Sequence, residues 1–223
     1  MSLKTLVSDP AWLFDFGFPV RRWGKKIDRE VPHTWELGDA YRIPALNSLS
    51  DTAGGATSWM AWSDEEILVR VQLPHAVPMS TPDIIFSLDF YIDSRSSRGI
   101  HRANAYCHLF QFRFRQSFFS PVQNKFVDAR PGLISRAKAI PAYNQSNRVC
   151  GWLTSTPSML DFKLLIPYQS VAGCDPREFP EWGVMWVVSD GRKRCSLARH
   201  SLQIPLDDPS LWCRARLVET SDA

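Results

Sequence analysis

The densest group of residues able to bind a metal ion lies in the stretch His-Arg-Ala-Asn-Ala-Tyr-Cys-His, from His101 to His108. Imidazole and thiolate are common zinc ligands in proteins. Adjacent residues of an extended strand point to opposite faces, however, so Cys107 and His108 cannot both bind one ion if this segment is a strand. We therefore expect a buried, hydrogen-bonded histidine beside Phe110 and Phe112, with no metal site.

The carboxylates offer a second possible chemistry. Asp89 and Asp93 fall on one face of an extended segment, but four residues of strand separate their backbones by roughly 13 Å. The two carboxyl groups of a glycosidase lie only about 5 to 9.5 Å apart. Residues 93–98 contain two arginines and no EF-hand pattern, which favours a solvated turn over a calcium site. Common nucleotide, zinc-protease and hydrolase motifs are also absent, so we expect a non-catalytic protein with no cofactor.

Aromatic side chains on a polar strand face suggest ligand binding instead. Tyr91 stands between Asp89 and Asp93, a setting that suits contact with a sugar or another polyol. Trp186 or Trp182 would extend this platform if either points outward, because a sheet presents side chains at fixed spacing. The alternatives are a cross-strand pair on a solvent face for Tyr91 and core packing for the tryptophans.

Composition narrows the class of protein. The 223 residues are 44% hydrophobic and 22% charged, values typical of a globular chain, and the net charge of +3 gives no support to nucleic-acid binding. No uncharged apolar run approaches the roughly 18 residues of a membrane span. The five cysteines form no C-x-x-C pair and the first residues lack a secretory core, so we expect free thiols and a cytoplasmic location.

Two segments alternate between apolar and polar residues, as half-buried strands do. We expect the first set of apolar side chains to face the core: Ile67, Val69, Val71 and Leu73. The second segment predicts Phe86, Leu88, Phe90 and Ile92 inward, with Ser87, Asp89, Tyr91 and Asp93 outward. Further candidate strands cover residues 57–62, 105–114, 134–140, 148–155, 159–166, 183–188, 195–201 and 214–218.

No segment shows the apolar stripe of a helix, whereas 27 aromatic and 16 proline residues favour short strands joined by turns. The fold expected is therefore all-β: an antiparallel β-sandwich of two sheets, in the size class of immunoglobulin-like domains. Residues 1–223 form one domain in this interpretation. Residues 56–218 are its core, and residues 1–50 are an irregular arm with one or two short edge strands.

Five blocks in order resemble the family 9 carbohydrate-binding-module-like group of the DOMON superfamily, over about residues 56–218. The blocks are Ala61–Val69, Ser87–Asp93, Phe162–Pro167, Gly183–Asp190 and Asp208–Trp212. The chain also resembles a subgroup of bacterial, chiefly planctomycete, proteins. This second resemblance rests on the segments His101-Arg102-Ala103 and Cys107-His108 and on the closing Asp-Pro-Ser-Leu-Trp.

The resemblance implies a saccharide held between two tryptophans and hydrogen-bonded by an acidic strand residue. Asp89 occupies the acidic position, while the tryptophan positions correspond to Asp83 and Leu206. A strand arginine of the family falls near His108, which would act as a pH-sensitive donor. The expected ligand-binding residues are thus Asp89, Tyr91 and His108, together with Trp186.

The leading function is a non-catalytic module that binds a carbohydrate or polyol. The alternative is a structural or protein-interaction domain that has lost the sugar site and uses its aromatic arm or a sheet face against a protein partner. A haem-binding domain would need axial ligands facing one pocket, with Met60 or Met185 opposite His108 as the candidates.

Overall fold

A computed structural model describes residues 17–28, 31, 34–44, 55–74, 82–97, 99–118, 120–143, 148–192, 194–197 and 206–219. Within these residues the chain forms strands and short 3-10 helices. The strands are β1 (Gly17–Arg22), β2 (Thr57–Trp62), β3 (Glu66–Pro74), β4 (Pro82–Asp93), β5 (Cys107–Phe118), β6 (Val122–Asp128), β7 (Arg130–Pro131), β8 (Cys150–Ser155), β9 (Met159–Pro167), β10 (Glu181–Ser189), β11 (Arg194–Ser196) and β12 (Cys213–Val218). The 3-10 helices are η3 (Asp39–Tyr41), η5 (Tyr168–Ser170) and η6 (Pro209–Leu211).

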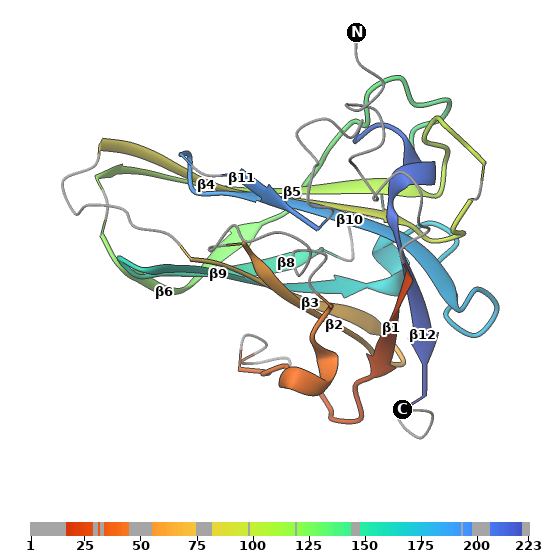
Figure 1. The fold of residues 1–223 in the computed structure, drawn as a ribbon, viewed down its shortest axis with the longest axis horizontal. Helices are drawn as coiled ribbons and strands as arrows, with labels where there is room; N and C mark the ends of the chain where they lie inside the picture. Colours follow the sequence, from red (N-terminus) through yellow and green to blue (C-terminus); the bar gives the residue numbers. More distant parts are fainter. Residues whose placement is uncertain are drawn as a thin grey trace, which may run out of the picture.

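The strands form one mostly antiparallel sheet that curls back on itself and is nearly barrel-like (Figure 1). Its order is β6-β8-β9-β3-β2-β1-β12-β10-β4-β5-β7, and β11 pairs with β10. The two separate sheets expected from the sequence are thus joined. Strand β1 makes the connection, because it pairs in parallel with β12 on one side and with β2 on the other. Its prediction as an edge strand is wrong, since both of its edges are paired.

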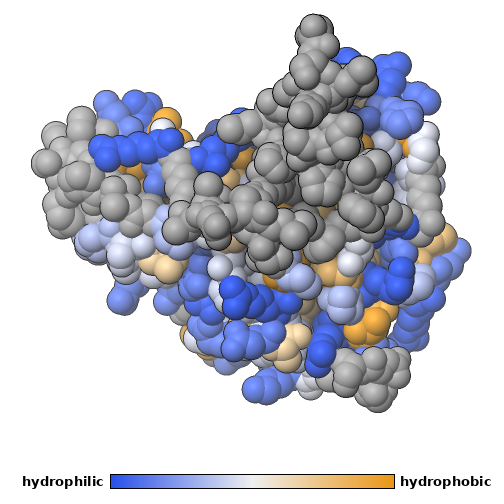
Figure 2. All heavy atoms as spheres, in the orientation of Figure 1, coloured by the Kyte–Doolittle hydropathy of each residue, from blue (hydrophilic) through white to orange (hydrophobic). Residues whose placement is uncertain are grey.

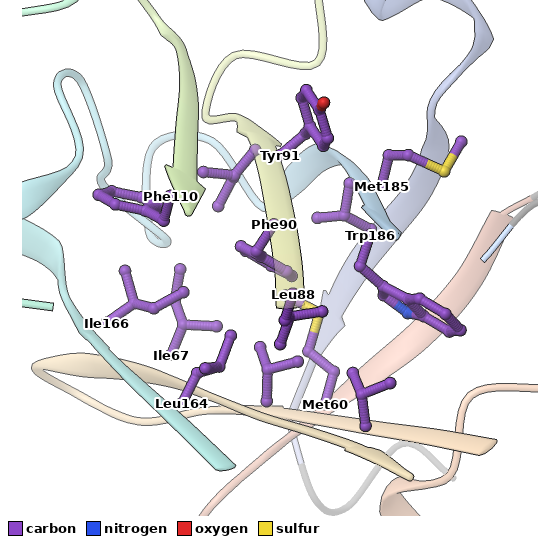
Figure 3. Packing of buried hydrophobic residues seen from close by; sticks show 14 of the residues in the cluster. Met60, Ile67, Leu88, Phe90, Tyr91, Phe110, Leu164, Ile166, Met185 and Trp186 are labelled. Atoms are coloured by element: carbon purple, nitrogen blue, oxygen red, sulfur yellow. The ribbon is translucent and has the colours of Figure 1, made fainter. Parts of the chain in front are cut away.

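The predicted alternation of β3 and β4 is confirmed on the side that faces the core. The eight side chains predicted to face the core are at most 1% exposed. Figure 3 shows Leu88 and Phe90 on the side of β4 nearest Ile67 and Leu164, with Tyr91 on the other side. The register explains this arrangement, because β4 pairs with both β5 and β10 and every second residue meets the opposite layer.

Most of the predicted strands are present, but one is absent and two were missed. Residues 134–140 form turns, and Arg136 has a φ of 54° that an extended strand does not allow. Strand β6 was missed because its side chains are mostly exposed and an irregular register around Asn124, where φ is 43°, breaks its alternation. Strand β7 has only two residues. Of the predicted strand 195–201, residues 198–201 lie outside the described part.

The segment after β1 covers the outer surface of strands β2, β3, β8 and β9. Trp23, Ile27, Trp35 and Leu37 are buried there against Trp59, Ala61, Leu68, Trp152 and Leu165. We call this surface the arm-covered face; its outward side chains include Trp59, Arg70, Trp152 and Lys163. In the described part of the chain, no helix is long and apolar enough to span a membrane.

Candidate functional site

Asp89 lies on the outward side of β4, where it meets two polar side chains of β5. The register pairs Asp89 with Gln111, whose Nε2 donates to Asp89 Oδ1 over 3.3 Å. Arg113 Nη2 donates to the same oxygen over 2.6 Å and forms an ion pair. The Asp89 side chain is 18% exposed and that of Arg113 is 37% exposed. This Asp89 cluster therefore offers a carboxylate, an amide and a guanidinium group at the molecular surface.

The cation beside Asp89 is Arg113, a residue that the sequence analysis did not single out. The signal was present in β5, whose residues alternate between aromatic and polar from Phe110 to Arg115. Phe112 is paired with Leu88 and faces the core, so Arg113 must face outward. Locating Arg113 next to Asp89 also requires the register between β4 and β5, which only the structure supplies.

The prediction that His108 lies in this site is wrong. His108 is paired with the core residue Ile92 and is fully buried on the inner side of β5. Its Nε2 accepts a hydrogen bond from the Ala172 N–H over 2.8 Å, and its ring stacks on Phe110. Burial lowers the pKa of His108 to about 4, so the ring is neutral near pH 7. The sequence interpretation of a buried, hydrogen-bonded histidine is the correct one.

Tyr91 shares the outward side of β4 with Asp89 but presents no exposed ring surface. It is 6% exposed and packs against Trp212, with ring centroids 5.5 Å apart. Burial, and to a smaller extent the Asp89 carboxylate, raises the pKa of Tyr91 to about 12. Its prediction as an apolar platform for a sugar ring is therefore wrong, because Trp212 covers the ring.

The segment before β12 holds Trp212 in this position. Asp208 caps helix η6 by accepting hydrogen bonds from the N–H and hydroxyl groups of Ser210. Arg136 binds Asp207 over 2.7 Å and lowers the pKa of that carboxyl group. These contacts fix the segment next to β4, which explains why an alternating strand carries a buried residue on its outward side.

Trp186 also lies outside the candidate site. It is paired with Phe90 on β4, is 2% exposed and points into the core. Trp182 is fully buried as well, so the two tryptophans considered as platforms have the core role that was their alternative. The outward residues of β10 include Met185, which is paired with Tyr91.

The two positions that correspond to the stacking tryptophans of the resembled family carry no aromatic ring. Asp83 is exposed near the start of β4, with a φ of 46°, and pairs with Arg115 over 3.4 Å. Leu206 is half-buried and packs against the main core. The groups that the Asp89 cluster presents are therefore hydrogen-bonding and charged ones.

The metal and haem alternatives do not fit the geometry. Cys107 and His108 lie on opposite faces of β5, and no group of three metal-binding side chains occurs within the described residues. Met185 faces outward from β10, whereas His108 faces the core, so they do not line one pocket. Met60 is a core residue, and the Nε2 atom of His108 is already bound to the Ala172 N–H.

Asp93 has a structural role at the end of β4. The prediction that it faces solvent is wrong, because its side chain is buried and accepts hydrogen bonds from the N–H groups of Arg95 and Ser97. Burial raises the pKa of Asp93, and these hydrogen bonds oppose that effect. Asp93 therefore stabilises the turn after β4.

No protein-family model matches the sequence, and no curated protein matches it. Among solved structures, the chain is similar to a family 9 carbohydrate-binding module from Caldicellulosiruptor kristjanssonii in complex with glucose. The TM-score is 0.53 at 16% identity, covering 92% of this chain and 97% of the other. A complex of such a module from the same organism with cellotriose gives a TM-score of 0.52 at 15% identity, covering 92% and 94% of the two chains. At this identity the likeness shows the fold alone: the chain has a fold like that of family 9 carbohydrate-binding modules.

Proposed function

We propose that the chain is a non-catalytic module that binds a saccharide or a related polyol at the Asp89 cluster. The observation that carries this proposal is the pairing of Asp89 with Gln111 and Arg113 at the surface. Neighbouring sugar hydroxyls both donate and accept hydrogen bonds. A carboxylate supplies acceptors, and guanidinium and amide groups supply donors. The similar solved modules were found in complex with glucose and with cellotriose, which supports a sugar as the ligand.

Binding at this site rests on hydrogen bonds because no aromatic ring is exposed beside Asp89 among the residues described here. Replacing Asp89 removes a charged acceptor, a loss that typically costs about 1.5 to 3 kcal/mol. We therefore expect Asp89→Ala to weaken sugar binding roughly ten- to a hundredfold. Tyr91 and His108 have no direct contact with the ligand in this proposal.

Calorimetric titration with glucose, cellotriose and a panel of other mono- and oligosaccharides tests the proposal. Asp83→Ala is the matched control, because it removes an exposed, arginine-paired carboxylate from the same strand. We expect the control to bind like wild type. Equal affinity in wild type and Asp89→Ala contradicts the proposed site.

The second candidate function is a structural or protein-interaction domain, favoured by the missing aromatic residues at Asp83 and Leu206. No heat with any sugar would favour it. The partner would then contact a sheet surface, because the arm residues Trp23 and Trp35 are buried against the chain's own sheet. Membership of the DOMON superfamily and of the planctomycete subgroup, and a cytoplasmic location, remain proposals from the sequence.

A further inference from the structure

A row of four outward residues crosses the strands beside Asp89. Arg113 on β5 pairs with Ser87 on β4, Ser87 pairs with Ser189 on β10, and Ser189 pairs with Arg194 on β11. Directly paired residues of antiparallel strands point to the same face of a sheet. Neighbouring strands lie about 4.8 Å apart, so the two arginine backbones are roughly 14 Å apart. The row therefore has a long cationic side chain at each end and two short hydroxyl side chains between them.

The charges around this row are unbalanced. We call the outward residues Arg113, Arg115, Arg130 and Arg194 the arginine face; Arg130 joins it because it pairs with Gln111. The acidic partners in the same strands are Asp89 and Asp83, which bind Arg113 and Arg115. Four arginines against two aspartates leave an excess of two positive charges, on a chain whose net charge is only +3.

Arg130 and Arg194 carry that excess. Both are exposed, and neither forms an ion pair with any residue in the described part of the chain. Most of the coloured atoms where β4 begins and β5 ends are hydrophilic, with a few hydrophobic ones among them (Figure 2).

Arg113 on β5 and Arg194 on β11 lie on opposite sides of Asp89 across the sheet. Burial and the carboxylates of Asp89 and Asp207 raise the pKa of Tyr91, whereas the positive charges of Arg194 and Arg113 both oppose that rise. Both positive charges therefore act on Tyr91, the next outward residue of β4 after Asp89. A ligand bound at Asp89 would have a guanidinium group on either side.

We propose that the ligand of this site is an anionic saccharide, with its ring hydroxyls at the Asp89 cluster and its oxyanion at Arg194. This inference rests on the proposed sugar-binding function and adds the chemical class of the ligand. Arginine suits the role because its planar fork donates two parallel hydrogen bonds to a carboxylate or a phosphate. Arg113 already donates to Asp89 and to the Phe112 carbonyl, so Arg194 is the arginine of the row with free donors in the described structure.

The test compares sugars that differ in charge on the full chain. Glucuronate, glucose 6-phosphate and glucose are titrated calorimetrically into wild type, Arg194→Ala and Arg194→Lys. We expect at least one charged sugar to bind wild type about tenfold or more tightly than glucose, the size of a charge-assisted hydrogen bond. The better of the two charged sugars identifies the oxyanion as a carboxylate or a phosphate.

Arg194→Ala should remove this preference and leave the affinity for glucose unchanged. Arg194→Lys should keep part of it, because the charge remains without the fork. Arg177→Ala is the control, since it removes an exposed arginine from the loop before β10, at the other end of that strand from Ser189. Raising the salt from about 0.1 M to about 1 M shortens the Debye length from about 10 Å to about 3 Å and should weaken binding of the charged sugar alone.

Equal affinity of wild type for glucose and for both charged sugars overturns the inference. An equal loss in Arg177→Ala and Arg194→Ala overturns it too, as does inorganic phosphate binding as tightly as the preferred charged sugar. If glucose binding depends on Asp89 while charge makes no difference, only this inference fails. If wild type binds neither neutral nor charged sugars, the proposed function fails with it.

Discussion

The two outer surfaces of the sheet both carry cationic side chains in rows across the strands. The cations on the arm-covered face bind acidic partners, whereas those on the arginine face are partly unpaired within the described residues. A row across the arm-covered face runs through Phe126, Trp152, Lys163, Arg70 and Trp59. Arg70 and Lys163 both bind Glu36, and Lys163 also donates to the Trp35 carbonyl over 3.2 Å. The row across the arginine face has serines between its cations. No segment in the described part of the chain covers this row as the segment after β1 covers the other face.

Arg70 has a structural role, which its partners show. Arg70 lies 5.2 Å above the Trp59 ring, and its Nε and Nη2 atoms make three hydrogen bonds to the Asp161 carboxylate besides its ion pair with Glu36. Its side chain is mostly buried, so these partners are needed to offset its desolvation. Arg194 is exposed and has no acidic partner in the described structure. Its positive charge is free to act on a ligand.

The largest effect that we expect is on the free energy of unfolding, when a buried residue of the segment after β1 is replaced. Trp35→Ala removes a buried indole that packs on the arm-covered face under the Lys163 ammonium group. Loss of a buried aromatic side chain costs about 3 to 5 kcal/mol. Ile85→Ala, at a 45% exposed position on the outward side of β4, should cost less than about 0.5 kcal/mol.

Urea denaturation of the two variants gives the comparison directly. A similar loss of unfolding free energy in both would show that the arm does not stabilise its face. If the arm detaches while the rest of the fold stays intact, Trp35→Ala can lower the free energy of unfolding by no more than the energy with which the arm docks. Hydrogen exchange of the β2 and β3 amides distinguishes that case from global unfolding.

A second prediction compares the two sides of β5, where His108 faces inward and Arg113 outward. The folded pKa of His108 is about 4 and the unfolded value is near 6.5, so the unfolded chain binds the extra proton between these pH values. Stability is therefore full above about pH 6.5 and falls as the pH drops towards 4, by roughly 3 kcal/mol from this residue.

His108→Gln isolates this contribution, because glutamine keeps a hydrogen-bond acceptor but does not titrate. The variant should be less stable than wild type at pH 7 and should lose less stability on acidification. Unfolding free energies measured at several pH values between about 4 and 7 show the difference. Parallel curves for the two proteins would mean that the pKa of His108 is the same in the folded and unfolded chain.

The sequence predicted the core better than the outer surfaces, for a physical reason. Inward residues such as Leu88 and Val69 repeat every second position because the core excludes water from that whole side of the strand. An outward residue depends on whatever lies over it. Tyr91 is buried because Trp212, more than a hundred residues later in the sequence, packs on it. The local sequence pattern around Tyr91 does not predict that contact.

The candidate site was predictable in part. Asp89 faces outward as its strand position requires, and its surface location followed from the alternation of β4. Its cation was placed at His108, which has the opposite parity to Arg113 in β5. Residues an odd number of positions apart in a strand face opposite sides of the sheet. Because the register of β5 was uncertain, a histidine that faces the core was predicted to bind the ligand. Strand β1 was misjudged because a short segment rich in aromatic residues and proline does not reveal that both of its edges are paired.

A third prediction returns to the arm-covered face. Asp161→Ala removes the acceptor shared by Arg70 and Gln72, which donate to it over 2.7 to 3.1 Å. The Arg70 guanidinium would keep only Glu36 as a hydrogen-bond acceptor, and the expected loss of stability is about 2 kcal/mol. Asp161→Asn keeps one acceptor oxygen and should lose less. Thermal unfolding measures both, and wild-type stability in Asp161→Ala would show that water replaces the carboxylate there.

The smallest expected effect is on the stability of Asp89→Ala, the matching change on the arginine face. Arg113 is 37% exposed, so water solvates its guanidinium once the carboxylate is gone, and exposed ion pairs contribute only about 0 to 1 kcal/mol. Asp89→Ala should therefore unfold at nearly the same urea concentration as wild type while losing sugar affinity. Asp161→Ala should show the reverse: lower stability with unchanged affinity. A loss of stability in Asp89→Ala as large as that in Asp161→Ala would mean that Asp89 is held for structure, and the contrast between the two faces would no longer point to a ligand.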